Sequence, residues 1–263
     1  MDSVLIDLGF IQIRWYSFLI LIALIIGYFL VLKETKKRNI SKDELNDLLF
    51  YLIIISILGA RVYYVLFNLK YYLQNPAEII MMWHGGLAIH GGIIAAVIFL
   101  VIYCKKKKIN TLLMTDILVV PLVLAQAIGR WGNFFNGEAF GRTVSLEFLK
   151  NLHLPKIIID GMYINGAYRE PTFLYESILC LIGFILLIII RKRLKIKTGT
   201  LTGIYLIWYG IIRLIIETFR SDSLMLGPLK MAQIVSIIGI IIGVYIIIKS
   251  KNNKLYTKDK LVK

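Results

Sequence analysis

Seven separate apolar stretches, each long enough to cross a lipid bilayer as a helix, constrain the fold of this chain more than any other feature. A membrane-spanning helix needs about 20 mostly apolar residues. We therefore predict a single polytopic membrane domain over residues 1–263, an all-α integral membrane protein with about seven transmembrane helices. Reading the apolar runs places these helices near 15–32, 47–67, 87–103, 112–128, 172–190, 202–219 and 231–248.

The distribution of positive charge predicts how the chain is inserted. The chain carries 31 Lys and Arg against 16 Asp and Glu. Most basic residues lie in alternate connections, around 33–42, 105–108 and 191–197, and in the tail at 249–263. Because basic loops stay in the cytoplasm, we expect the N-terminus outside and a basic cytoplasmic tail, which we expect to be mobile from about residue 249. This placement indicates that the basic residues set the orientation of the chain in the membrane and attract anionic lipids, and it argues against nucleic-acid binding.

Few residues suggest redox or metal chemistry. Cys104 and Cys180 lie at or within predicted helices, and we interpret both as structural thiols. The sequence has no cluster of His, Asp and Glu with ligand spacing and no nucleotide-binding loop. We therefore expect no metal and no cofactor.

The longest connection, 129–171, lies on the predicted outer side. Turn pairs at Asp160-Gly161 and Asn165-Gly166, among β-branched residues, favour a small hairpin or irregular cap. Its apolar content indicates an ordered outer-side cap segment.

The run GRWGNFFNGEAFG, at 129–141, concentrates polar groups directly after an apolar helix. It holds Arg130, Asn133, Asn136 and Glu138. Polar side chains at membrane depth usually line a cavity filled with water or ligand, because exposure to lipid is costly. We therefore interpret this run as part of a site.

A second polar series runs along one face of the predicted helix at 202–219. Tyr209, Arg213 and Glu217 recur every four residues. An Arg at the centre of a span costs about 2.5–3.5 kcal/mol, so a partner is expected, and Glu217 is the local candidate. A purely structural pair remains possible. The same reasoning applies to Arg61, with a stronger structural alternative.

Histidine and tyrosine residues near the predicted outer ends are further candidates. His90 is followed by Gly91 and Gly92, which would leave its imidazole in a pocket of small residues. A histidine bonded to a neighbouring helix is the competing interpretation. Tyr16 is by default an interfacial anchor. The arginines suit a phosphate group, since a guanidinium offers two parallel donors, and a phospholipid headgroup fits best.

Taken together, these residues resemble the prolipoprotein diacylglyceryl transferase family over nearly the whole chain. The run GRWGNFFNGEAFG is highly specific, and HGG at 90–92, GARVYYVLF at 59–67, PTFLYE at 171–176 and YGIIRLIIETFR at 209–220 also look like the family. One departure is Glu170, at a position that is often His in the family, so a catalytic role is not carried over to it.

The resemblance implies a reaction in the bacterial cell membrane. The diacylglyceryl group of phosphatidylglycerol would pass to the thiol of the lipobox cysteine of a secreted prolipoprotein, releasing glycerol phosphate. We expect His90 to accept the thiol proton and Arg130 and Arg213 to bind the phosphate; alternatively, the arginines alone lower the thiol pKa and His90 only positions lipid. The remaining residues would bind substrate or orient these groups, namely Tyr16, Arg61, Asn133, Asn136, Glu138, Gly141, Tyr209 and Glu217.

Other classes of membrane protein also carry intramembrane charges. A lipid or small-anion transporter with an arginine-lined site is the main alternative, but the sequence shows no inverted repeat. A rhomboid-like protease would need a membrane serine in a GxSxG-like run, which is absent. A purely structural bundle would not gather Arg, Asn and Glu in this way.

Overall fold

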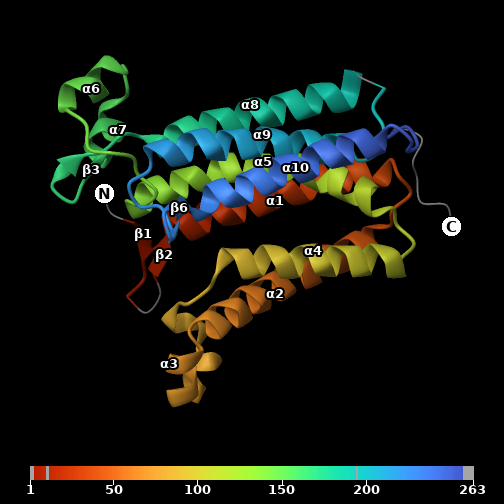
Figure 1. Ribbon diagram of the computed structural model, residues 1–263, viewed down its shortest axis with the longest axis horizontal. Helices are drawn as coiled ribbons and strands as arrows, with labels where there is room; N and C mark the ends of the chain where they lie inside the picture. The colour runs from red at the N-terminus through yellow and green to blue at the C-terminus, as the bar shows by residue number, and fades with distance from the viewer. Residues whose placement is uncertain (1–2, 10–11, 194, 257–263) are drawn as a thin grey trace. The chain divides into compact units, whose positions relative to one another are not determined.

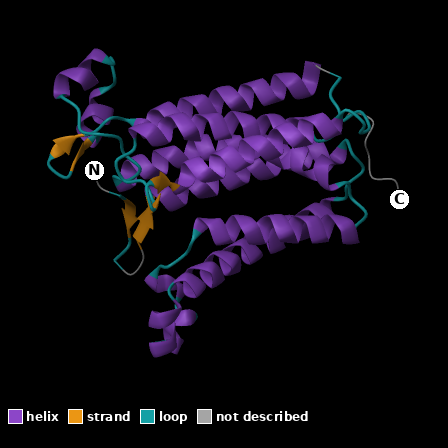
Figure 2. Cartoon of the chain, in the orientation of Figure 1, coloured by secondary structure: helices purple, strands orange, loops and turns teal. Residues whose placement is uncertain are grey.

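The structure is a computed structural model that describes residues 3–9, 12–193 and 195–256. Seven of its helices are long and apolar enough to cross a membrane (Figures 1 and 2). They are α1 (Trp15–Lys36), α2 (Lys42–Phe67), α4 (Ile89–Lys106), α5 (Thr111–Asn136), α8 (Thr172–Arg193), α9 (Thr200–Phe219) and α10 (Met231–Ser250). The predicted all-α membrane architecture is thereby confirmed.

Short elements connect these helices. The short helices are α3 (Leu69–Gln74), η1 (Pro76–Ile79), η2 (Met82–His84), α6 (Leu146–Asn151) and α7 (Lys156–Gly161). Three antiparallel pairs join β1 (Val4–Asp7) to β2 (Gln12–Arg14), β3 (Tyr163–Ile164) to β4 (Ala167–Tyr168), and β5 (Met225–Leu226) to β6 (Leu229–Lys230).

The predicted hairpin forms at one of its two candidate turns. Asn165 and Gly166 join β3 to β4 with φ angles of 52° and 78°, as a tight two-residue turn requires. Asp160 and Gly161 instead end α7. Helices α6 and α7 pack Leu149 and Ile158 against Phe134 and Phe173, which makes this cap an ordered part of the structure.

The described residues form two compact units, one built from the described parts of 3–31 and 115–256 and the other from residues 32–114. In the first unit, α9 packs against α8 and α10. Gly203 and Gly243 face each other across α9 and α10, since a Cβ on either would lie 2.8 Å from the backbone oxygen of the other. Small residues at such contacts let helix backbones approach closely, as is common in membranes.

The second unit is built on the antiparallel pair α2 and α4. Gly59 and Gly91 form the contact, because a Cβ on Gly91 would lie 2.5 Å from the backbone oxygen of Gly59. Helix α2 begins with a capping box in which Ser41 and Glu44 each bind the other's backbone N–H. The glycines after His90 therefore serve helix packing.

Helix α5 extends to Asn136, whereas the sequence predicted its end at 128. A hydropathy window stops where polar residues begin, but Arg130 and Asn133 bond each other within the helix at 3.2 Å. The helix ends only at Gly137, whose φ is 63°. The connection predicted at 129–171 therefore begins eight residues later.

The start of the basic tail is ordered, contrary to the predicted mobility from residue 249. Helix α10 continues to Ser250, and the next residues bond the connection before α9. The Thr198 N–H donates to the Lys254 oxygen, and the Tyr256 N–H to the Ile196 oxygen. Tyr256 is only 1% exposed. Residues 257–263 lie outside the described part of the chain.

Candidate functional site

Four charged side chains from three helices of the first unit form one network. Arg130 comes from α5, Glu176 from α8, and Arg213 with Glu217 from α9, helices that lie side by side in Figure 1. One oxygen of Glu176 lies 2.6 Å from Arg130 Nη2, and the other lies 3.0 Å from Arg213 Nη1. Arg213 Nη2 lies 2.6 Å from Glu217. Glu176 therefore links the two arginines.

The two carboxylates of this network are buried more deeply than its guanidinium groups. The side chains of Glu176 and Glu217 are 3% and 2% exposed, against 17% for Arg130 and 12% for Arg213. Buried charges are stable only when they are paired and hydrogen-bonded. The two carboxylates therefore have guanidinium partners at hydrogen-bond distance, and the arginine side chains keep a small exposed fraction.

Tyr209 joins the same network. Its hydroxyl accepts a hydrogen bond from Arg130 Nη2 at 3.2 Å and donates to Glu176 at 3.4 Å. The ring stacks on Tyr205, whose hydroxyl accepts from Gln126 at 2.9 Å. Within the described residues, the buried Nε of Arg130 and Oε1 of Gln126 have no hydrogen-bond partner.

The polar run at the end of α5 extends the network outwards. Asn133 accepts from Arg130 Nη1 and donates to Glu138 at 2.9 Å. Asn136 donates to the same Glu138 oxygen at 3.2 Å. The structure thus brings together Arg130, Asn133, Asn136 and Glu138 through consecutive hydrogen bonds.

Gly141 is required for close packing of the chain beyond this run. A Cβ at this position would lie 2.8–3.0 Å from atoms of Glu170 and Thr172. Glu170 is buried and accepts from Arg142 Nε at 3.0 Å, so its carboxylate is paired. The structure gives Gly141 a packing role and Glu170 an ion-pair role.

Tyr16 contacts the same helix as Arg130. Its ring lies against Gly132, where a Cβ would come within 2.5 Å of Tyr16 Cδ2. The residue is 38% exposed. The contact fixes the outer end of α1 against α5.

Two predicted site residues, Arg61 and His90, belong to the second unit. Arg61 is 5% exposed, and its guanidinium donates to backbone oxygens between residues 78 and 86. His90 is the second residue of α4 and is partly exposed, with its ring centroid 6.5 Å from that of Tyr63.

Comparison with known proteins matches these residues to a family. The model of the prolipoprotein diacylglyceryl transferase family matches residues 3–249. The chain belongs to this family. A phosphatidylglycerol–prolipoprotein diacylglyceryl transferase of Staphylococcus saprophyticus is 48% identical over 94% of this chain and 88% of its own length. The protein of the same name from Staphylococcus aureus strain Newman is 47% identical over 98% and 93%. The resemblance predicted from the motifs is confirmed.

Sequence reasoning missed the residue at the centre of this family member's network. Glu176 ends the motif PTFLYE, which we recognised without assigning a role to the carboxylate. The available signal was its isolation, since it is the one acidic residue of α8. Arg220, 4.0 Å from Glu217, and Gln126 were also missed.

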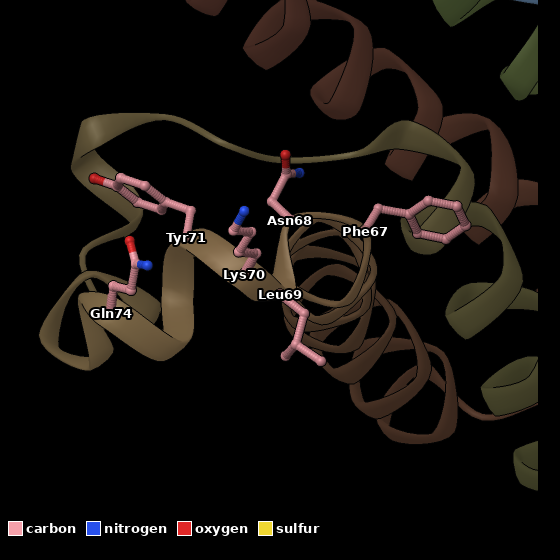
Figure 3. Close-up of a pocket in the computed structure, with 6 residues that line it drawn as sticks. All are labelled: Phe67, Asn68, Leu69, Lys70, Tyr71 and Gln74. Carbon is pink, nitrogen blue, oxygen red and sulfur yellow. The ribbon is translucent and has the colours of Figure 1, made fainter.

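A shallow hollow of about 410 Å³ lies elsewhere, at the turn from α2 to α3 (Figure 3). Its lining residues are Phe67, Asn68, Leu69, Lys70, Tyr71 and Gln74. Its lining includes Phe67, the last residue of the motif at 59–67, but none of the charged residues of the network, and Lys70 is the one charged residue there.

Proposed function

We propose that the protein transfers the diacylglyceryl group of phosphatidylglycerol to the thiol of a lipobox cysteine in a secreted prolipoprotein. The name shared by the two relatives supports this proposal. The observation that carries it is a pair of linked arginines that keep unused N–H groups. The protein would work in the bacterial cell membrane, with its N-terminus outside and its C-terminus in the cytoplasm.

The reaction is an alkylation of sulfur. A bond forms between the cysteine sulfur and the glyceryl carbon, while the bond from that carbon to the phosphate oxygen breaks. The oxygen keeps the electron pair and leaves as glycerol phosphate, and the thiol proton passes to a base. The protein must therefore activate a thiol and stabilise a departing phosphate.

Arg130 and Arg213 have donors available for that phosphate. A guanidinium carries five N–H groups. Within the described residues Arg213 uses two of them, one on Glu176 and one on Glu217. Arg130 leaves one Nη1–H unused, whereas its Nε–H is unpaired but buried. These free donors, held in place by buried carboxylates, would bind the phosphate oxygens and offset their growing charge.

The other residues of the network orient these donors. Glu176 and Glu217 hold Arg213, while Asn133 and Tyr209 hold Arg130. Glu138 fixes the amides of Asn133 and Asn136. Tyr16 would line one side of the place beside α5 where the lipid headgroup binds. Gly141 would allow the chain after the polar run to pack closely.

His90 would accept the thiol proton. An ordinary cysteine thiol has a pKa near 8.5, so only a few per cent is thiolate at neutral pH, and a base raises the reactive fraction. The alternative is that the arginines alone favour the thiolate and His90 only positions lipid. If His90→Ala keeps near-normal turnover while Arg213→Ala abolishes it, the alternative holds.

A product assay tests the proposed function. Purified protein in detergent is incubated with phosphatidylglycerol and a lipobox peptide, and both glycerol phosphate and the mass of the peptide are measured. We expect equal amounts of both products, and neither with a control peptide whose cysteine is replaced by serine. Lipid binding without either product would favour the transporter, for which the names of the relatives provide no support.

A further inference from the structure

The guanidinium of Arg61 is enclosed by the backbone of the segment that leads into α4. Nε donates to the Ile79 oxygen at 3.0 Å, and Nη1 donates to the oxygens of Gly85 and Gly86 at 2.6 and 2.9 Å. Nη2 donates to the oxygens of Glu78 and Met81. Five carbonyl groups thus match the five N–H groups of an arginine.

We propose that Arg61 is a positioning residue that fixes the start of α4, and with it His90, instead of binding the lipid phosphate. The inference rests on the proposed function in one respect, since it takes His90 as the reacting group to be positioned. Because every donor of Arg61 is already used on the backbone, none is left for a phosphate.

The two glycines of the segment allow this enclosure. Gly85 and Gly86 have φ angles of 88° and 79°, a region that favours glycine. A Cβ on Gly86 would lie 2.5 Å from Arg61 Nη1 and 2.8 Å from a ring carbon of Tyr64, whereas a Cβ on Gly85 would meet nothing within 4 Å. Only Gly86 is therefore required for the close contact with Arg61.

The enclosed segment continues directly into His90. The Ala88 N–H donates to the oxygen of Ala60, the residue before Arg61, at 3.0 Å. Two residues after Ala88 comes His90, and Gly91 then packs against Tyr63 of α2. Within the described residues no hydrogen bond holds the His90 ring, so the backbone on either side sets its position.

Lysine cannot take the place of Arg61. An ammonium group has three donors on a compact centre, whereas the segment presents five carbonyls around a planar group. Arg61→Lys therefore keeps the charge but leaves at least two carbonyls without a donor. A displacement of about 1 Å at a reacting group can lower the rate about a hundred-fold.

The test compares two pairs of variants of the full protein. Arg61→Lys is matched by Lys70→Ala, at an exposed residue of α3. Gly86→Ala is matched by Gly85→Ala, at a glycine that also has a positive φ but whose added Cβ would collide with nothing. For each variant, kcat and KM for phosphatidylglycerol are measured, together with amide hydrogen exchange over residues 76–92.

We expect Arg61→Lys and Gly86→Ala to lower kcat about ten- to a hundred-fold, with KM within about two-fold. Exchange of the Ala88 amide should accelerate in both and stay slow in the two controls. A rise in KM of about ten-fold or more with unchanged exchange would make Arg61 a lipid ligand, and unchanged kcat in Arg61→Lys would equally overturn the proposal.

A double variant separates this inference from the proposed function. In a His90→Gln background, Arg61→Lys should cause little further loss of kcat, because the group it positions is already missing. If the loss of kcat in the double variant equals the product of the two single losses, Arg61 does not act through His90. If His90→Gln alone keeps full activity, the base assignment fails, while the exchange measurement still decides whether Arg61 holds the segment.

Discussion

Arg213 and Arg61 both lie inside apolar membrane-spanning helices, yet the chain satisfies them with different groups. Arg213 is bound by two carboxylates, Glu176 from α8 and Glu217 from its own helix. Arg61 is bound by backbone oxygens of a segment 17 to 25 residues further along the chain. The first arrangement balances the charge with few contacts and leaves donors unused, whereas the second uses every donor. An arginine that is paired but not saturated can still bind a ligand.

The largest effect is expected from removing the guanidinium of Arg213. Arg213→Met should lower turnover about a thousand-fold, as loss of a group that stabilises a developing charge does. It also leaves Glu217 buried without its closest partner, which should cost about 3–5 kcal/mol of stability. Turnover and thermal unfolding in detergent measure the two effects. If turnover of Arg213→Met stays within about ten-fold of the wild type, Arg213 does not bind the phosphate in a way that distinguishes it from Arg61.

A second substitution separates the two effects of Arg213→Met. Adding Glu217→Gln removes the stranded charge, so much of the lost stability should return, since the penalty comes from an uncompensated buried carboxylate. Turnover should stay low, because the phosphate donors are still missing. Recovery of activity along with stability would show that Arg213 only maintains the fold.

Neutralising the residue that links the arginines should have an intermediate effect. Glu176→Gln keeps the shape of the side chain but loses its charge, so turnover should fall about ten- to a hundred-fold, as for residues that orient a reacting group. Glu170→Gln is the matched control, since Glu170 is a buried carboxylate paired with Arg142 outside the network. Equal losses of turnover in both variants would show that Glu176 has no specific role in orienting the two arginines.

The smallest effect concerns packing near the network. Gly141→Ala places a Cβ 2.8–3.0 Å from Glu170 and Thr172, and overpacking of this kind costs about 1–3 kcal/mol. Gly239→Ala, on α10 with open space around its Cβ, should instead be neutral or stabilise by up to about 1 kcal/mol. Thermal unfolding of the two variants should show opposite shifts, and equal shifts would contradict the packing role of Gly141.

The sequence predicted the seven helices and most of the network because both depend on local patterns. Apolar runs indicate spans, and the spacing of four residues between Tyr209, Arg213 and Glu217 places them on one face. The sequence could not show that Glu176 links Arg130 to Arg213, because this depends on how α5, α8 and α9 pack.

What the sequence did not show has the same origin. Arg61 resembles Arg213 in sequence, and only the folded chain shows that backbone oxygens surround its guanidinium; its predicted role in binding substrate stays a prediction. The extension of α5 to Asn136 and the burial of Tyr256 likewise depend on hydrogen bonds that hydropathy does not register.

Product inhibition tests most directly whether unused guanidinium donors bind the phosphate. Glycerol phosphate, the proposed leaving group, should inhibit transfer from phosphatidylglycerol, and its inhibition constant is measured for the wild type, Arg213→Lys and Arg61→Lys. We expect the constant to rise about ten-fold or more in Arg213→Lys, since one lost charge-assisted hydrogen bond costs about 1.5–3 kcal/mol, and to stay within about two-fold in Arg61→Lys. An unchanged constant in Arg213→Lys, or an equal rise in both variants, would contradict the account.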